Sequence, residues 1–332
     1  MSIWYNVIHN YYLGIDGGGS RTISLVADCR GNVATYEAGP GINFYASGIE
    51  ESRKNLRVVV GKLAQKIDIK RIKRAFIGNS AIDYSINDDA VKAYKNGILD
   101  CPLSMRSDAY AALVGHTLGG KGCLVISGTG SVAVSRDAAG QYRQLGGWGH
   151  LLGDEGSAYE IAVKGYKAAI HCFDGLGSGI LPDTMLAARV MERHGLSEPY
   201  ELLKVINPGL GKKEIAAFSL DVKECAEAGD NIALGILEEA AIYLAELGAA
   251  AAKLAGVSVI GIYGSVLTKD RFVRENFERF FALHVNGGTA VEPQLPPVAG
   301  AVLLAMAEDG IAVSGEIIAN LKNGIAGIME HH

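Results

Sequence analysis

The chain has 332 residues, 49% of them hydrophobic and 20% charged, with a formal net charge of −5. This balance is typical of a globular protein and argues against a fibrous or disordered chain. Binding to nucleic acid needs clustered Lys and Arg to neutralise phosphates, so a negative chain without a long basic run is not expected to have nucleic acid as its partner.

The cysteines and the N-terminal residues indicate the cellular compartment to expect. The five cysteines are widely spaced and form no Cys-x-x-Cys pair, so neither a disulfide framework nor a zinc ribbon is predicted. Residues 1–12 lack a basic segment followed by an apolar run, and no segment reaches the ~18 consecutive apolar residues of a membrane span. We therefore expect a cytoplasmic protein without a membrane partner.

Short apolar runs in the first third predict three strands, then a helix, then a fourth strand. The first strand, residues 12–15, breaks into a turn of three glycines, and strands follow at residues 23–27 and 33–36. Apolar residues at helical spacing predict a helix over residues 50–67, and residues 75–78 form a buried strand.

A second cycle of the same layout begins at residue 123, with a strand, a Gly/Ser/Thr turn at residues 127–131, a second strand, a further turn and a third strand. Because the layout repeats, we expect a duplicated unit and two similar lobes. Helices are predicted over residues 157–169, 184–194, 215–228 and 233–255, from residue 270, and over 300–307, with a strand at 257–263. Strands that alternate with helices indicate an α/β protein.

We expect two domains. The first is residues 1–117, with the last helix, residues 315–332, packing back on it, and the second is residues 118–314.

Two turns rich in Gly, Ser and Thr follow predicted strands, at residues 16–20 and 127–131. Such turns can present backbone N–H groups and hydroxyls to an anion. Each turn alone is more simply a plain hairpin, but two turns at equivalent positions of duplicated lobes suggest a clamp for a nucleotide triphosphate. The P-loop and the Rossmann glycine motif are both absent from the sequence.

Two aspartates lie where they could take part in chemistry. Asp16 ends the first strand, where a carboxylate could hold Mg²⁺ through water, although Asp is also a common turn residue. Asp108 opens an Ala-rich helix, and judged alone it is best interpreted as a helix N-cap.

The densest signal is the segment 146–157, which has five glycines, Trp148 and the adjacent acids Asp154 and Glu155. This composition suits a pocket floor better than a core. His150 and the two acids could hold a metal, but a single His without a partner at ligand spacing disfavours that reading.

At these residues the chain resembles the BadF/BadG/BcrA/BcrD family and, within it, the N-acetylglucosamine kinases of the actin, hexokinase and Hsp70 superfamily. The resemblance covers residues 13–307, and its strongest elements are the segments 16–20, 107–109, 126–131 and 147–157. It implies an α/β fold of two ribonuclease H-like lobes, a duplicated βββαβα unit, with an inter-lobe active-site cleft. It also implies a homodimer.

The resemblance implies a role for individual residues. Asp108 would be the catalytic base, and Asp16 would aid Mg²⁺. Residues of the ATP site would be Asp16, Gly18, Gly19, Ser20, Arg21, Thr22, Gly128, Thr129, Gly130, Gly264 and Ser265, with Ala216 and Lys269 as weaker candidates. The sugar would contact Asn43, Asp108, Ser131, Gly147, Trp148, Gly149 and Asp154. Two positions depart from the family pattern, since Arg21 replaces a common Lys and a single glycine, Gly264, replaces a common pair.

The implied activity is transfer of the γ-phosphate of Mg-ATP to the 6-hydroxyl of N-acetylglucosamine, or of a close relative such as glucosamine or N-acetylmuramic acid. Asp108 would act as the general base, a contribution of typically 10²–10⁴-fold. An ATPase activator of a 2-hydroxyacyl-CoA dehydratase is disfavoured, because no cysteine lies in the Asn-Asp-x-Cys-Ala-type segment it requires. A non-catalytic sugar sensor is disfavoured because Asp16, Asp108 and the second turn are all present.

The choice of sugar stays open at this point. Glucosamine would need an acid near its amine, N-acetylmuramic acid a cation near its lactyl carboxylate, and N-acetylglucosamine a small pocket with an amide partner. Glu155, Arg143 or His150 could fill the first two roles. N-acetylglucosamine leads only because it is the substrate that the resemblance implies.

Overall fold

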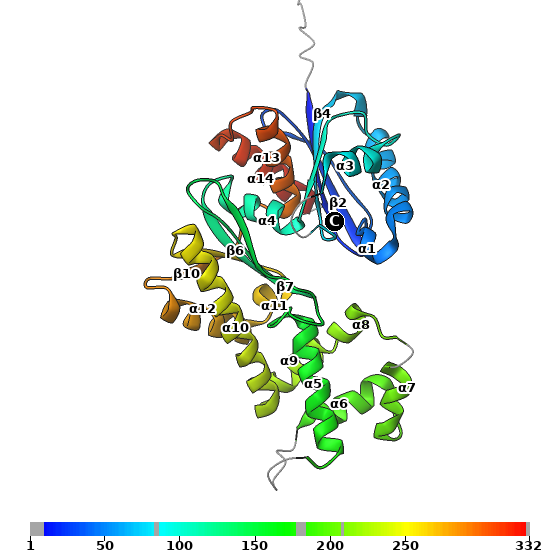
Figure 1. The fold of residues 1–332 in the computed structure, drawn as a ribbon, viewed down its shortest axis with the longest axis vertical. Coiled ribbons are helices and arrows are strands. Elements are labelled where there is room, and N and C mark those ends of the chain that lie inside the picture. Colours follow the sequence, from blue (N-terminus) through cyan, green and yellow to red (C-terminus); the bar gives the residue numbers. More distant parts are fainter. Residues whose placement is uncertain (1–9, 83–85, 177–183, 207–208, 330–332) are drawn as a thin grey trace, which may run out of the picture. The chain divides into compact units, whose positions relative to one another are not determined.

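The structure is a computed structural model that describes residues 10–82, 86–176, 184–206 and 209–329. The chain divides into two compact units (Figure 1). Unit 1 is residues 1–121 together with 293–332, and unit 2 is residues 122–292.

Unit 1 is built on a five-stranded sheet with the order β3-β2-β1-β4-β5. The first three strands are antiparallel neighbours, and β4 and β5 continue the sheet in parallel. The strands are β1 Tyr11–Gly17, β2 Arg21–Asp28, β3 Val33–Pro40, β4 Ile72–Asn79 and β5 Leu103–Arg106. The helices are α1 Phe44–Ser47, α2 Ile49–Ala64, α3 Asp88–Lys95, α4 Asp108–Thr117, α13 Pro297–Glu308 and α14 Gly315–Met329, with a 3-10 turn η1 Ile69–Arg71.

Helices cover both faces of this sheet, which explains why β1 is buried along most of its length. Tyr12 packs in one core with residues of α13 and α14, while Leu13 packs in another with residues of α2 and α3. The close approach of α13 to β1 requires glycine in the strand, because a Cβ on Gly14 would lie 2.4 Å from the carbonyl oxygen of Val298. The sheet is therefore fixed from both sides.

Helix α13 lies in unit 1, although the sequence-based boundaries placed it in the second domain. It packs on α4 and on β1, and a Cβ on Gly300 would lie 2.0 Å from the carbonyl oxygen of Ala111. The segment that returns to unit 1 thus begins at residue 293, not at residue 315. The small residues of α13 serve this packing.

Unit 2 repeats the same pattern of strand pairing, with the order β10-β9-β6-β7-β8. Strands β6, β7 and β8 are antiparallel neighbours, and β9 and β10 extend the sheet in parallel from β6. The strands are β6 Gly122–Ser127, β7 Ser131–Arg136, β8 Tyr142–Gly146, β9 Val259–Tyr263 and β10 Thr289–Val291. The helical elements are α5 Ala158–Phe173, α6 Met185–His194, η2 Pro199–Glu201, α7 Leu202–Ile206, α8 Lys212–Ala216, α9 Ser219–Glu227, α10 Asn231–Ala255, α11 Ser265–Lys269 and α12 Arg271–His284. The repeated topology confirms the predicted α/β fold of two similar units.

The helix predicted over residues 215–228 is two helices, and Phe218 explains the break. Helix α8 ends at Ala216 and α9 begins at Ser219. Phe218 lies between them, is fully buried and stacks on Tyr166 with the ring centroids 4.3 Å apart. The junction of the two helices thus places an aromatic ring in the core of unit 2.

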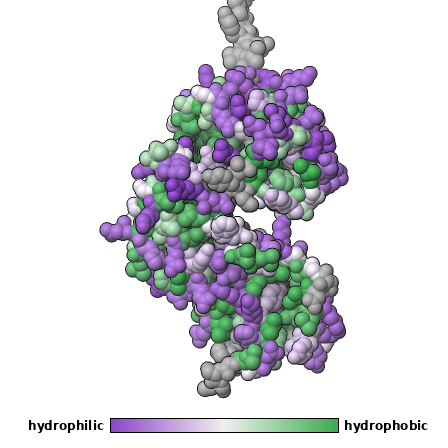
Figure 2. Space-filling view, viewed as in Figure 1, coloured by the Kyte–Doolittle hydropathy of each residue, from purple (hydrophilic) through white to green (hydrophobic). Residues whose placement is uncertain are grey.

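The long helix α10 is a core element of unit 2. Eleven of its residues are buried, most of them Ala and Leu, and it contacts β6, β7, α9 and α12. The visible face of each unit mixes hydrophilic and hydrophobic residues (Figure 2). Within the described residues, no helix is both long and apolar enough to cross a membrane.

Candidate active site

Unit 1 brings Asp16 and Asp108 together on either side of Gly78. Asp16 is near the end of β1 and pairs across the sheet with Gly78 of β4. Asp108 is the first residue of α4, and a Cβ on Gly78 would lie 3.2 Å from its Cα. Because Gly78 has no side chain, the start of α4 can approach the strand that neighbours Asp16.

The two carboxylates influence each other. Burial, and secondly the negative charge of Asp108, raise the pKa of Asp16 to about 7. A carboxyl group that loses solvent beside a second carboxylate resists ionisation, and a nearby cation would reverse that effect. The pair therefore suits a site that takes up a cation.

Asp108 is not the cap of its helix, because the neighbouring serine has that role. Ser107 is the N-cap of α4, and its hydroxyl accepts a hydrogen bond of 3.2 Å from the backbone N–H of Tyr110. Oδ1 of Asp108 accepts a hydrogen bond of 2.7 Å from the N–H of Ala109. The helix start thus orients the carboxylate while leaving capping to Ser107.

The first glycine turn joins β1 to β2. It is closed by a 3.1 Å hydrogen bond from the N–H of Gly18 to the carbonyl of Arg21, and Gly19, Ser20 and Arg21 are exposed. A Cβ on Gly19 would meet no atom within 4 Å, so packing does not require glycine there. This open position fits the approach of a phosphate.

Thr22 was predicted to bind the nucleotide, but its side chain is fully buried in β2. Its hydroxyl makes no hydrogen bond within the described residues. The side chain therefore faces the core, and the exposed groups of the turn precede it.

Asn43 is held by two sets of hydrogen bonds in unit 1. Its Oδ1 caps α1 by accepting from the N–H groups of Tyr45 and Ala46, at 2.9 and 3.0 Å. Its Nδ2 donates to Oγ of Ser80 at 2.9 Å, and the N–H of Ser80 donates to the carbonyl of Gly17 at 3.0 Å. The amide is therefore fixed relative to the end of β1.

The second glycine turn joins β6 to β7 in unit 2. The N–H of Gly128 donates to the carbonyl of Gly130 at 2.9 Å, Thr129 is exposed, and a Cβ on Gly128 would meet no atom within 4 Å. The hydroxyl of Ser131 is directed away from solvent and donates to the carbonyl of Glu155 at 2.6 Å. The turn is thus tied to the glycine-rich segment that follows β8.

Asp154 lies directly beneath this second turn. It has a positive φ of 62°, which is uncommon for a residue other than glycine, and a Cβ on Gly130 would lie 2.9 Å from its carboxylate. Its Oδ2 is 2.6 Å from Nζ of Lys212, the first residue of α8. The predicted sugar-binding acid therefore already has a cationic partner.

Gly147, Trp148 and Gly149 lie between β8 and Asp154. Both glycines have positive φ values, 71° and 84°, which a side chain would disfavour. The side chain of Trp148 is 80% exposed. A tryptophan held on a glycine-rich turn with its ring in solvent is suited to pack against a ligand.

The predicted adenosine turn lies against the second glycine turn within unit 2. Gly264 has a φ of 92°, and a Cβ there would lie 2.2 Å from the carbonyl oxygen of Ser127. Ser265 and Lys269 are exposed at the two ends of α11. The side chain of Ala216 is buried in the core, so any contact with a nucleotide would come from its backbone.

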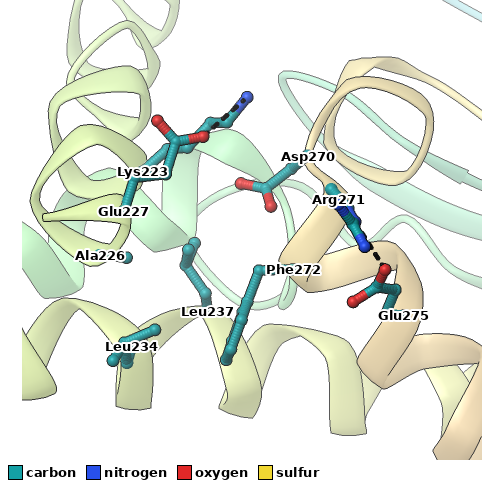
Figure 3. A pocket seen from close by; sticks show the side chains of 9 residues that line it. All are labelled: Lys223, Ala226, Glu227, Leu234, Leu237, Asp270, Arg271, Phe272 and Glu275. Atoms are coloured by element: carbon teal, nitrogen blue, oxygen red, sulfur yellow. Dashed lines mark hydrogen bonds and ion pairs between the residues drawn. The ribbon is translucent and has the colours of Figure 1, made fainter. Parts of the chain in front are cut away.

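A cavity of about 270 Å³ in unit 2 is lined by none of the predicted residues, although its Asp270 directly follows the candidate Lys269 (Figure 3). Its charged groups already have partners, since Arg271 pairs with Glu275 and Asp270 caps α12. Lys223 pairs with Glu227 and also donates to the carbonyl of Lys269. The other lining residues are Ala226, Leu234, Leu237 and Phe272.

The described residues contain no group of three or more His, Cys, Asp or Glu side chains that could hold a metal ion by themselves. His150 packs edge-on against Tyr159, with the ring centroids 4.9 Å apart, instead of joining a ligand set. Asp16 fits a cation that is bound mainly by other ligands, such as phosphate oxygens and water. This arrangement is typical of Mg²⁺ that enters with a nucleotide.

Three residues of these arrangements were missed from the sequence. Gly78 is required by the approach of α4, Ser80 fixes Asn43, and Lys212 pairs with Asp154. Gly78 is the last residue of a predicted strand and Ser80 follows closely after it. Their place at the end of a strand could have marked them as candidate site residues. Lys212 is 58 residues from its partner and gave none.

The chain matches known proteins over most of its length. The model of the BadF/BadG/BcrA/BcrD ATPase family matches residues 13–305. The chain is 30% identical to an N-acetylmuramic acid/N-acetylglucosamine kinase of Clostridium acetobutylicum over 90% of this chain and 99% of that protein. It is 28% identical to an N-acetyl-D-glucosamine kinase of Dictyostelium discoideum, over 71% of this chain and 77% of that protein.

A solved structure from Chromobacterium violaceum, described as that of a candidate N-acetylglucosamine kinase, has the same fold. The TM-score is 0.73 at 21% identity, and the similarity covers 90% of this chain and 99% of that chain. The extent of the family match decides the assignment. The chain belongs to the BadF/BadG/BcrA/BcrD ATPase family.

Proposed function

We propose that this protein is a kinase that transfers the γ-phosphate of Mg-ATP to an amino sugar, at the 6-hydroxyl of N-acetylglucosamine or a close relative. The observation that carries the proposal is the proximity of Asp16 and Asp108, where burial and, secondly, the charge of Asp108 raise the pKa of Asp16. A sugar kinase needs one acid beside the metal and one beside the attacking hydroxyl. The curated relatives named above, both kinases of amino sugars, support the same class of substrate.

In this proposal Asp108 accepts the proton of the sugar hydroxyl. The hydroxyl oxygen forms a bond to the γ-phosphorus while the bond from that phosphorus to the β–γ bridging oxygen breaks, and ADP leaves. The N–H of Ala109 holds one oxygen of Asp108 in place, so the carboxylate keeps its orientation. Mg²⁺, when bound with ATP, supplies positive charge to the phosphates.

The two glycine turns would bind phosphates through their backbone N–H groups. Their tips are exposed, and Gly19 and Gly128 leave space where a side chain would stand. On the sugar side, we assign contacts to Asn43, Asp154 and the ring of Trp148. Each has a fixed backbone setting, which favours the alignment on which phosphoryl transfer depends.

The test measures ADP release from Mg-ATP with N-acetylglucosamine, N-acetylmuramic acid, glucosamine, glucose, no sugar, or a 2-hydroxyacyl-CoA dehydratase in place of the sugar. Binding of each sugar is measured in parallel by calorimetry. We expect release that depends on an N-acetylated amino sugar and falls strongly in Asp108→Asn. Asp100→Asn, an exposed acid of unit 1, serves as the matched control. Sugar binding without sugar-dependent ADP would favour a sensor, and release only with a 2-hydroxyacyl-CoA dehydratase would overturn the kinase.

A further inference from the structure

Lys212 lies beside the predicted sugar-binding residue Asp154, and the proposed reaction gives it no role. It opens α8, and its ammonium Nζ is 2.6 Å from Oδ2 of Asp154. The carboxylate is only 5% exposed, while the lysine side chain is 34% exposed. The pair therefore has a buried acid and a cation that reaches solvent.

The local structure keeps the acid in place. Asp154 has a positive φ, Gly130 leaves room for its carboxylate, and the N–H of Ser131 is 3.5 Å from its Oδ1. A buried carboxylate is costly without a partner, and Lys212 provides one. The lysine thus sets the charge of this part of the predicted sugar site.

Charge decides which amino sugars Asp154 can face. An unpaired carboxylate would repel a sugar that carries its own carboxylate, and it would attract a sugar that carries an amine. Paired with Lys212, Asp154 does neither. An ammonium has three N–H donors, of which the bond to Asp154 uses one, so the group can also contact an acidic substituent.

Within the described residues, the neighbouring acid, Glu155, is held by a hydroxyl and not by a cation. Burial and the carboxylate of Glu155, which also accepts a hydrogen bond from the Tyr243 hydroxyl, raise the pKa of Tyr243 to about 12. Both acids of the segment therefore have partners within unit 2, Asp154 in Lys212 and Glu155 in Tyr243. A hydroxyl donor does not neutralise a carboxylate, so it is the pairing of Asp154 with Lys212 that weakens the attraction of this segment for an amine.

We propose that Lys212 is a specificity-determining residue that lets the sugar site accept an N-acetylated amino sugar bearing a carboxylate, N-acetylmuramic acid, beside neutral N-acetylglucosamine. The inference rests on the proposed kinase function and deepens it. The lysine offsets the charge of Asp154 and faces the lactyl carboxylate, so its effect depends on the charge of the sugar and not on its size.

The test compares kcat/KM for N-acetylmuramic acid, its neutral lactyl amide and N-acetylglucosamine in the full-length protein. The wild type is expected to use the acid and the neutral sugar, and to prefer the acid over its amide. Lys212→Gln should lower the ratio of acid to N-acetylglucosamine by about tenfold or more, the size expected for losing a charged contact. Lys212→Arg should keep the ratio within about threefold, and Lys213→Gln, an exposed neighbour, should leave it unchanged.

Several results would overturn the proposal. A wild type that phosphorylates N-acetylglucosamine but not the acid would contradict the role proposed for Lys212. The proposed kinase function would still hold. An equal fall for all sugars in Lys212→Gln would show that the lysine merely supports Asp154 or acts on the phosphates. If Lys212→Gln does not fold, the wild type alone provides the test. Equal kcat/KM values for the acid and its amide would then reject the proposal. ADP release with none of the sugars would instead reject the kinase itself.

Discussion

Units 1 and 2 share one pattern of strand pairing, but the charged side chains near their glycine turns are arranged differently. In unit 1, Asp16 and Asp108 lie close together, and burial with mutual repulsion raises the pKa of Asp16. In unit 2, the buried acid beside the corresponding turn, Asp154, is paired with Lys212. The comparison shows that a duplicated scaffold can place two acids side by side in one unit and pair a buried acid with a lysine in the other.

The largest expected effect is on the acidic pair of unit 1. Asp108→Asn should lower kcat by about 10²–10⁴-fold with a smaller change in KM, because the amide cannot accept the proton of the sugar hydroxyl. Steady-state kinetics with saturating Mg-ATP would measure both constants. The role given to the acidic pair is contradicted if Asp108→Asn keeps more than about a tenth of the wild-type kcat while Asp100→Asn behaves as wild type.

The raised pKa of Asp16 predicts a pH dependence of stability in the protein without ligands. The folded state holds a proton on Asp16 that the unfolded chain releases near its usual pKa of 3.8, and the folded pKa is about 7. Folding therefore binds protons between these values, so the free energy of unfolding should fall as pH rises from about 4 to about 7. The contribution of Asp16 is up to about 4 kcal/mol.

Urea unfolding of the wild type and Asp16→Asn across this pH range would isolate the contribution. The asparagine variant should lose most of the decline, because its side chain does not titrate. Parallel curves for the two proteins would show that Asp16 ionises normally and that the two units do not differ in the way described above.

Gly264 tests the close contact within unit 2. Gly264→Ala should lower the free energy of unfolding by on the order of 3 kcal/mol, because the residue has a φ of 92° and the new Cβ would overlap the carbonyl of Ser127. Gly229 has nearly the same φ, 91°, and no neighbour within 4 Å. Gly229→Ala should therefore cost only about 1 kcal/mol in the same urea experiment, the strain alone. Equal costs would show that the contact is not tight.

Gly78 offers the smallest and most specific test, this time in unit 1. Gly78→Ala places a methyl group 3.0 Å from Cβ of Ala111 and 3.2 Å from Cα of Asp108, a contact that a small shift of α4 can relieve. We expect kcat to fall about tenfold, since small displacements of a catalytic group are costly, with little loss of stability. An unchanged kcat would mean that the position of α4 does not set the geometry of Asp108.

The sequence predicted the elements whose signals are local. The strands around both glycine turns, and the long helix α10, show regular patterns of apolar residues, and the structure contains them. Strands β5 and β10 were missed because they have only four and three residues and lie at the edges of their sheets. The split of residues 215–228 depends on Phe218 entering a core formed by distant residues.

The residues of the candidate site were likewise predictable only where their signals are local. Asp16 lies at the end of a predicted strand, so its position could be inferred from the sequence. Asp108 follows β5, which was missed, and only the Ala-rich helix that it opens gave a signal. The partner of Asp154 could not be inferred, because Lys212 reaches it only through the packing of α5, α8 and the segment after β8. Likewise the burial of Thr22 follows from the pleat of β2, and the turn motif alone does not show it.

The most direct test of the central claim is the structure of the product. The protein would be incubated with Mg-ATP and N-acetylglucosamine, and the sugar phosphate examined by two-dimensional ¹H–³¹P NMR. The proposal predicts a new phosphorus signal coupled to the two H6 protons of the sugar, formed together with ADP and absent with Asp108→Asn. Coupling to another ring proton would contradict the assigned hydroxyl, and free phosphate without any sugar phosphate would contradict the kinase.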